Sequence, residues 1–511
     1  MDYLLGIDAG SSSVKTALFD TEGKMITLSI NEYELIMPSP NIVEIEPDTF
    51  WQKLKMGVRE ILATSKARPE QIKAMAISSQ GETFITLDKR GQPLRRAIFW
   101  YDNRATKEVD ILADKFDRKT AYHITGMPEI IPLWSASKLL WLRENEPDVF
   151  SKAHKFLLVE DYLIYRLTGQ YVGEFSCYPS TMILDIQNKC WWSDMLDVIG
   201  LDPGKLVELQ ESGQPVGPLT TEAAKDLGLA PETLVATGGY DHAAGAIGSG
   251  NTQPGVVTET TGSALVVNTT VAKPTFDPKL RVPCQYHSIP DRYFLSSFSE
   301  TGGMAFKWHR DNFCLEEQQQ AEKDGVKTAF AFMDDGADEI PAGSEGLILL
   351  PHLSGALCPE GNPNARGVLF GLALKHGKKH LTRAFLEGIA FMLRRHIEAV
   401  EEVGVNVEEV IGIGGGARSR IWGQIKANVL NKPVVHLETE EPSLLGAAIL
   451  AGYAAGTYGD LETASRQMVK TRVTAEPNPK NVAIYQELYE RYGQIYERLA
   501  DVFPKLRDQE N

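Results

Sequence analysis

The feature that most constrains this chain is a short hairpin that occurs twice, once at the start of each half. Apolar runs that predict strands flank each turn: residues 4–7 and 14–19 in the first copy, and 256–260 and 264–267 in the second. The turns consist of small residues: Gly10, Ser11 and Ser12 in the first copy, and Thr261, Gly262 and Ser263 in the second. About half of the 511-residue chain separates the copies. Self-similarity at so long a period predicts two related lobes.

Both turns have the composition of an anion-binding loop. Small residues let backbone N–H groups approach a phosphate closely. Asp8 ends the first strand, where a carboxylate can hold Mg²⁺ together with phosphate oxygens, and Lys15 adds a positive charge nearby. An ordinary Gly/Ser hairpin with a surface acid and base is the alternative for this stretch alone.

Size and charge limit the classes of protein that this chain can belong to. Its length fits two domains of about 250 residues, and the breaker-rich residues 249–255 place the boundary so that the domains are 1–248 and 249–511. The net charge of −16 argues against nucleic acid or an anionic membrane as a partner, because both need a basic surface. No apolar run approaches the about 20 residues of a membrane helix. Five scattered cysteines and a start without a signal peptide predict a cytoplasmic protein without disulfides or a zinc site.

Polar residues follow the predicted strands at two further places in the first half. Gln80, Gly81 and Glu82 come after a buried strand at 72–78, where α/β folds place ligand groups. They are candidates for binding several hydroxyls, and a plain polar loop is the alternative. Asp241 lies at an uncrowded, Gly-rich junction between a strand and a helix. It is a candidate general base for a substrate hydroxyl, with simple capping of the helix as the alternative.

In the second half, a Gly-rich turn follows the strand predicted at 410–413. It contains Gly415, Gly416 and Ala417. Bare backbone of this kind can lie against a flat ring such as adenine, although Gly-rich turns between a strand and a helix are common.

Taken together, these stretches resemble the FGGY carbohydrate kinases, within the actin/hexokinase-like ATPase superfamily. The resemblance extends from residue 4 to about residue 459. It rests on these blocks: GIDAGSSSVKTALFD, SASKLLWLREN, EDYLIYRLTG, GGYDHAAGAIG, GVLFGLALKHGKKHLTRAFLEG and GGGARSRIWGQI. It implies an α/β fold with two ribonuclease H-like domains and a cleft between them. The sugar is then expected on the N-terminal lobe and ATP mainly on the C-terminal lobe.

The resemblance also implies a role for each matching residue. Asp241 is expected to accept the proton of the sugar hydroxyl, and Asp8 to organise Mg²⁺. Gln80, Gly81 and Glu82 are expected to contact the sugar. The expected ATP contacts are Gly10, Ser11, Ser12, Lys15, Thr261, Gly262, Ser263, Gly303, Lys307, Gly415, Gly416 and Ala417.

Departures from the family pattern bear on the substrate. Glycerol kinases carry Arg where this chain has Gly81 and Tyr where it has Leu133, so glycerol is not expected. Xylulokinases usually have Gln-Met-His-Gly at the Gln80 loop, and that His is missing here. Length and block spacing still look most like the xylulokinase branch. D-xylulose is therefore the expected substrate, with another pentulose such as ribulose, a polyol, or an aldonate such as gluconate as alternatives.

The same comparison bears on the sugar pocket, on the rival classes of protein and on assembly. Because Gly81 has no side chain, the sugar pocket is expected to have spare room there. An actin- or chaperone-like ATPase and an inactive sugar-binding regulator are the rival classes. Assembly as a homodimer, and the effect of Ala356 and Leu357 where the family often carries charges, remain open.

Overall fold

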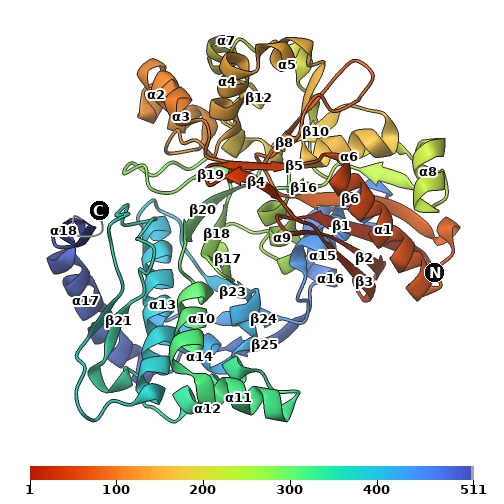
Figure 1. Cartoon of the computed structure of the whole chain (residues 1–511). Coiled ribbons are helices and arrows are strands. Elements are labelled where there is room, and N and C mark those ends of the chain that lie inside the picture. The colour runs from red at the N-terminus through yellow and green to blue at the C-terminus, as the bar shows by residue number, and fades with distance from the viewer. Residues whose placement is uncertain (508–511) are drawn as a thin grey trace.

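The N-terminal half is built around a seven-stranded sheet that begins with the predicted hairpin (Figure 1). The computed structural model describes residues 1–507. The central strand β1 (Tyr3–Ala9) pairs antiparallel with β2 (Ser13–Asp20) and parallel with β6 (Ile72–Ser79). Its apolar side chains are buried, as expected of a strand covered on both faces. The remaining strands are β3 (Met25–Glu32), β14 (Pro215–Pro218), β15 (Leu234–Ala236) and β16 (Gly239–Tyr240).

The second half repeats this arrangement in another seven-stranded sheet. Here β17 (Val256–Thr261) pairs antiparallel with β18 (Leu265–Val271) and parallel with β23 (Glu409–Ile413). The other strands are β19 (Cys284–Tyr286), β20 (Tyr293–Ser299), β24 (Val434–Leu437) and β25 (Thr471–Ala475). The predicted repeat of the hairpin is therefore confirmed, since both copies occupy the same position in their sheets.

Helices bury one apolar face against each sheet. In the first half, α1 (Asp48–Ser65) packs on β2 and β3. Helices of the second half include α10 (Gly303–Phe313), α11 (Leu315–Asp324), α12 (Ala329–Asp338), α13 (Lys378–Glu401), α14 (Arg420–Leu430), α17 (Pro479–Leu499) and α18 (Phe503–Arg507). The long helix α13 packs against α12, α14 and β18, and its buried side chains form much of the local core.

One segment of the second half packs against the first. Helix α15 (Pro442–Ala454) contacts β1, β6 and α9 (Asp241–Ser249), and α16 (Leu461–Met468) follows it; in Figure 1 both lie beside the strands β1–β3. Glycines make this contact close, because a Cβ on Gly446 would lie 1.8 Å from the carbonyl oxygen of Ala244. The start of α9 is thereby fixed to residues far along the chain.

A smaller five-stranded sheet sits above the N-terminal one in Figure 1. Its strands are β4 (Ile36–Ser39), β5 (Ile42–Ile45), β7 (Phe84–Leu87), β8 (Ala97–Ile98) and β9 (Lys155–Leu158). Helices α4 (Ser135–Asn145) and α6 (Val159–Thr168) lie next to it. The block SASKLLWLREN forms the whole of α4, and residues 131–134 form a turn before it.

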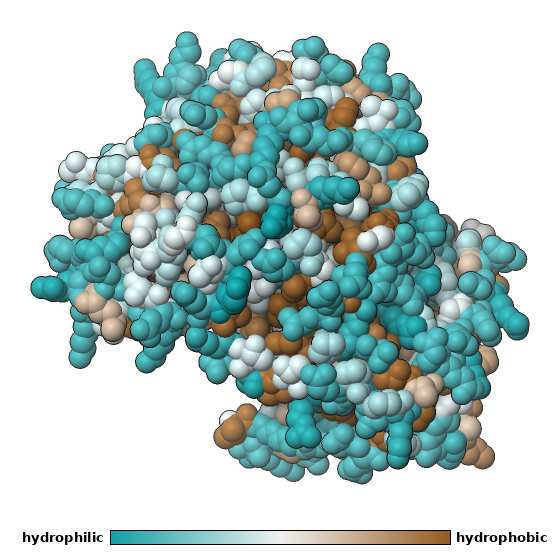
Figure 2. Space-filling model, turned by 180° about the vertical axis from the view of Figure 1, so that it is seen from behind, coloured by the Kyte–Doolittle hydropathy of each residue, from teal (hydrophilic) through white to brown (hydrophobic). Residues whose placement is uncertain are grey.

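Figure 2 shows the molecule from behind. Hydrophilic side chains cover most of this face, and apolar side chains reach the surface mainly in its middle, between the upper and lower parts. Within residues 1–507, no helix combines the length and the apolar character needed to cross a membrane.

Candidate active site

Asp8 lies near the end of β1, between polar residues on both neighbouring strands. Strand pairing places it beside Lys15 on β2 and Ser78 on β6. Ser78 Oγ donates a hydrogen bond of 3.1 Å to Asp8 Oδ1. Burial, and after it the nearby charge of Asp241, raises the pKa of Asp8 to about 7. Two carboxyl groups that repel each other in this way form a suitable donor set for a hard cation such as Mg²⁺.

Asp241 is the first residue of α9 and remains accessible. Its Oδ1 accepts a hydrogen bond of 2.7 Å from the backbone N–H of His242, and its side chain is 35% exposed. An accessible carboxylate fixed at a helix start can accept a proton from a bound hydroxyl.

Buried polar groups hold β16, the short strand that leads to Asp241. Glu160 Oε1 accepts a hydrogen bond of 2.7 Å from the N–H of Gly238, and Ser176 Oγ accepts one of 2.9 Å from the N–H of Tyr240. Burial, and after it the charges of Glu174 and Asp161, raises the pKa of Glu160 well above its usual range. Glu160 lies at the start of α6, and its contact with Gly238 joins residues that are far apart in the chain. The local sequence therefore contained no signal for this contact.

The first phosphate-type turn is held by side chains from other segments. Gly10 donates its N–H to the carbonyl of Ser13 at 3.1 Å, and its own carbonyl accepts a hydrogen bond from the hydroxyl of Tyr33. Ser11 and Ser12 are exposed, as contacts to a ligand require. Lys15 points toward an acid at the start of α15 rather than being free.

Gln80 supports this turn, in addition to its predicted role toward the sugar. Its Nε2 donates to the carbonyl of Gly10 at 3.3 Å, and its Oε1 accepts from Thr83 Oγ1 at 3.2 Å. Both ends of the amide are therefore engaged. Glu82 is buried at the end of the same loop, and its pKa is raised by burial and by the charge of Asp241. The structure thus brings Glu82, Asp8 and Asp241 into one electrostatic group.

The expectation of spare room at Gly81 is wrong. A Cβ at this position would lie 3.2 Å from Cε2 of the Tyr240 ring and 3.6 Å from the hydroxyl oxygen of Ser180. The residue that precedes Asp241 therefore fills the space that Gly81 leaves open. Local sequence could not show this, because the two residues meet only through the pairing of β16 with β6.

The lysine of the block SASKLLWLREN, Lys138, has a structural role. Lys138 is fully buried on α4, and its Nζ donates to the carbonyls of Phe99 at 2.9 Å and Trp100 at 2.5 Å. Burial lowers the pKa of Lys138. The loop that it fixes brings Trp100 to the first turn, where the indole Nε1 donates to Ser11 Oγ at 2.9 Å. The sequence pattern did not indicate a role for Trp100, because its contact with Ser11 joins segments that are far apart in the chain.

A cavity of about 370 Å³ lies in the second half of the chain. Most of the predicted ATP contacts of that half line it: Thr261, Gly262, Ser263, Gly303, Lys307, Gly415 and Gly416. Glycine is needed where these segments meet, because a Cβ on Gly416 would lie 2.7 Å from Cβ of Thr261. Ala417 is buried, and its carbonyl accepts a hydrogen bond from Arg472 at 2.9 Å, so it supports the turn rather than lining the cavity.

The cavity walls are largely apolar. Sequence reasoning missed these lining residues: Phe306, Phe330, Asp334, Ser419 and Trp422. Aromatic walls and bare glycine backbone fit a flat purine base, and the turn at Gly262 fits its phosphates. Lys307 is paired with Asp311 at 2.7 Å on the exposed side of α10.

The second turn also rests on a buried polar group. Lys426 Nζ lies 2.6 Å from Glu259 Oε1 and 2.9 Å from Thr261 Oγ1, and Lys426 and Glu259 are shielded from solvent. The Thr261 hydroxyl donates to Glu259 Oε2 at 2.6 Å. This group fixes the second turn as Gln80 fixes the first.

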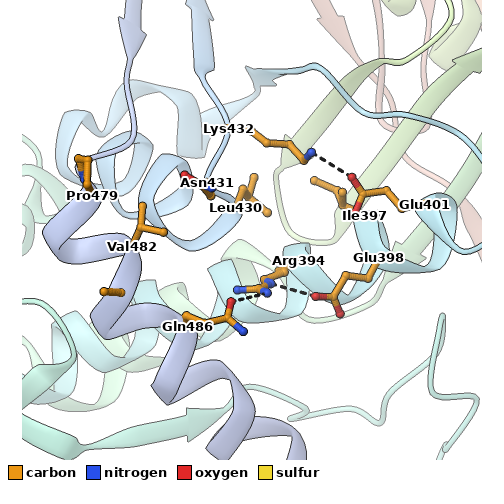
Figure 3. Close-up of a pocket in the computed structure, with 11 residues that line it drawn as sticks. Arg394, Ile397, Glu398, Glu401, Leu430, Asn431, Lys432, Pro479, Val482 and Gln486 are labelled. Carbon is orange, nitrogen blue, oxygen red and sulfur yellow. Dashed lines mark hydrogen bonds and ion pairs between the residues drawn. The ribbon is translucent and has the colours of Figure 1, made fainter.

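A separate hollow of about 570 Å³ lies between α13, α14 and α17 (Figure 3). Its charged side chains are already paired. Arg394 donates to Glu398 at 2.9 Å and to Gln486 at 2.8 Å, and Lys432 forms an ion pair with Glu401. The contact between Arg394 and Gln486 joins α13 to α17. Within residues 1–507, none of the predicted site residues lines this hollow.

Comparison with known proteins defines the class. Residues 3–248 match the N-terminal domain and residues 257–455 the C-terminal domain of the FGGY family of carbohydrate kinases. The chain therefore belongs to this family of sugar kinases, and the predicted resemblance is confirmed.

Individual relatives agree with the class but differ in substrate. The chain is 31% identical over 494 residues to a xylulose kinase of Bacillus subtilis, with 96% of each chain covered. It is 29% identical to a gluconokinase of the same species, with 92% of this chain and 91% of the relative covered. A ligand-bound xylulose kinase from Lactobacillus acidophilus has a similar structure, with a TM-score of 0.89, 28% identity, and coverage of 99% of this chain and 100% of that one. These matches confirm the two-domain α/β fold of the actin/hexokinase type. The boundaries 1–248 and 249–511 and the site residues stay predictions.

Proposed function

We propose that this chain transfers the terminal phosphoryl group of ATP to a hydroxyl of D-xylulose, forming D-xylulose 5-phosphate. Membership of a sugar kinase family and the similarity to xylulose kinases support the reaction type and the sugar. The gluconokinase is almost equally similar, so the choice of sugar depends on the site itself.

One observation favours a neutral sugar: carboxyl groups dominate the site. Burial, and after it the charge of Asp241, raises the pKa of both Asp8 and Glu82. The nearby cations are occupied, since Lys15 pairs with an acid and Lys138 donates to two backbone carbonyls. The carboxylate of an aldonate would be repelled here, whereas the hydroxyls of a pentulose can donate to carboxylate oxygens.

Each residue has a definite task in this reaction. Asp241 accepts the proton of the attacking hydroxyl. Asp8 holds Mg²⁺, which when bound neutralises charge on the phosphate oxygens. Backbone N–H groups of the turns at Gly10 and Gly262 position the phosphates, and Glu82 accepts hydrogen bonds from sugar hydroxyls. Positioning and charge neutralisation supply most of the rate enhancement in phosphoryl transfer.

The test is a substrate panel with purified protein. ADP release is measured with D-xylulose, D-ribulose, L-ribulose, glycerol and gluconate, and the product is identified by phosphorus NMR. We expect D-xylulose to give the highest kcat/KM. If gluconate or glycerol is better by about tenfold, or about 1.4 kcal/mol in transition-state binding, the pentulose proposal is wrong while the family assignment stands.

A further inference from the structure

The cavity of the second half contains an acid to which the phosphate chemistry gives no role. Asp334 is on α12 and lines the cavity together with Phe330, Ser419 and Trp422. Its Oδ1 is buried and has no hydrogen-bond partner within residues 1–507. An unpaired buried acceptor destabilises a fold, so a structure keeps one at a ligand cavity when the ligand supplies the missing donor.

The Asp334 carboxyl group lies beside Ser419, the residue at the start of α14. Ser419 caps that helix: its Oγ accepts the N–H of Trp422 at 3.1 Å. The hydroxyl hydrogen of Ser419 is then left to donate, and the nearby Ser419 side chain opposes the rise in the pKa of Asp334. Burial raises the pKa of Asp334 to about 6, so the group is mainly ionised at neutral pH. The cavity therefore presents one free, charged acceptor among apolar walls.

We propose that Asp334 selects the base of the nucleotide by accepting a hydrogen bond from the exocyclic amino group of adenine. This inference rests on the proposed ATP-dependent function. Hypoxanthine has a carbonyl in place of that amino group, and a carboxylate would repel it. Guanine carries a carbonyl there too, and its donors, N1–H and the 2-amino group, lie further along the same edge of the base. A site built around one donor rejects analogues that lack it, because its buried acceptor is then left unpaired.

The chain provides a matched control one residue away. Asp335 is on the same helix but is exposed, and it forms an ion pair with Lys327. Replacing either carboxyl by an amide changes the net charge of α12 equally. Only the change at position 334 removes an acceptor from the cavity.

The experiment measures nucleotide binding by calorimetry without sugar. The wild-type chain should bind ADP more tightly than IDP, and more tightly than purine riboside diphosphate, which lacks the amino group, by about tenfold to a hundredfold. In Asp334→Asn the ratio of ADP to IDP affinity should fall to about threefold or less, because an amide can also donate to the carbonyl of hypoxanthine. Asp335→Asn should keep the wild-type ratio.

Three outcomes would overturn the inference. They are equal binding of ADP and purine riboside diphosphate by the wild-type chain, an unchanged ratio in Asp334→Asn, or no binding of ADP. The comparison of ADP with purine riboside diphosphate needs no variant, so it tests the inference even if a substitution disturbs folding. Selective ADP binding without phosphorylation of any sugar would instead contradict the proposed function and leave this inference standing.

Discussion

Lys15 Nζ lies 2.6 Å from Glu441 Oε2, so the lysine predicted to contact phosphate is paired with an acid at the start of α15. The side chains are 27% and 22% exposed. A partly exposed pair of this kind contributes at most about 1 kcal/mol, because water screens it. Phosphate therefore has to compete with Glu441 for Lys15, but at a small cost.

This pair predicts that Glu441→Gln tightens nucleotide binding. Without the carboxylate, Lys15 is free and one negative charge near the phosphates is removed, so the Kd for ADP should fall about twofold to fivefold. Lys15→Met should raise that Kd. Calorimetry with ADP gives both values. Glu462→Gln is the control, since Glu462 forms a similarly exposed pair with Arg292. Weaker ADP binding in Glu441→Gln would show that the pair supports the site instead of competing with ligand.

The contact between Gly81 and Tyr240 predicts that Gly81→Ala impairs sugar binding. The added Cβ, 3.2 Å from the ring of Tyr240, must displace that ring, which directly precedes Asp241, by a few tenths of an ångström. Overpacking of about 1 kcal/mol would lower kcat/KM for the sugar about fivefold while leaving ADP affinity unchanged. Gly493→Ala is the matched control, because nothing lies within 4 Å of its Cβ position. Unchanged sugar kinetics in Gly81→Ala would mean that the ring does not border the sugar.

The raised pKa of Asp8 predicts a pH-dependent stability difference. Asp8 binds its proton more tightly in the folded chain, with a pKa of about 7, than in the unfolded chain, with a pKa of about 3.9. Its ionisation therefore destabilises the fold increasingly as the pH rises from about 4 to 7. Without Mg²⁺, Asp8→Asn should be more stable than wild type at pH 8, and the advantage should shrink at pH 5 by about 1–3 kcal/mol, allowing for screening.

Thermal unfolding at both pH values measures this difference. Asp117→Asn is the control, because hydrogen bonds from Thr120 lower the pKa of Asp117, the opposite direction. An equal advantage of Asp8→Asn at pH 8 and pH 5 would contradict the account.

The sequence predicted the parts of the fold that local pattern determines. Both hairpins, the strands before Gln80 and Gly414, and the helix start at Asp241 follow from apolar runs and small-residue turns, and the structure has them. The turn residues that we propose as phosphate contacts could be named for the same reason, since the approach of backbone to a ligand depends on the local residue type.

What the sequence could not predict depends on pairs distant in the chain. The ring of Tyr240 over Gly81, the Lys15–Glu441 pair and the carbonyl contacts of Lys138 each join segments that only the tertiary fold brings together. Asp334 was missed because an acid on an amphipathic helix is usually solvated, and only the cavity reveals its buried oxygen.

The most direct test of the account is the turnover of Asp241→Asn with D-xylulose and MgATP, measured beside wild type. Removing a positioned base typically lowers the rate by about 10²–10⁴-fold, and we expect that loss in kcat while ADP binding and thermal stability stay close to wild type. Sugar-dependent turnover within about threefold of wild type would contradict the assignment of Asp241 as the base, and with it the proposed mechanism.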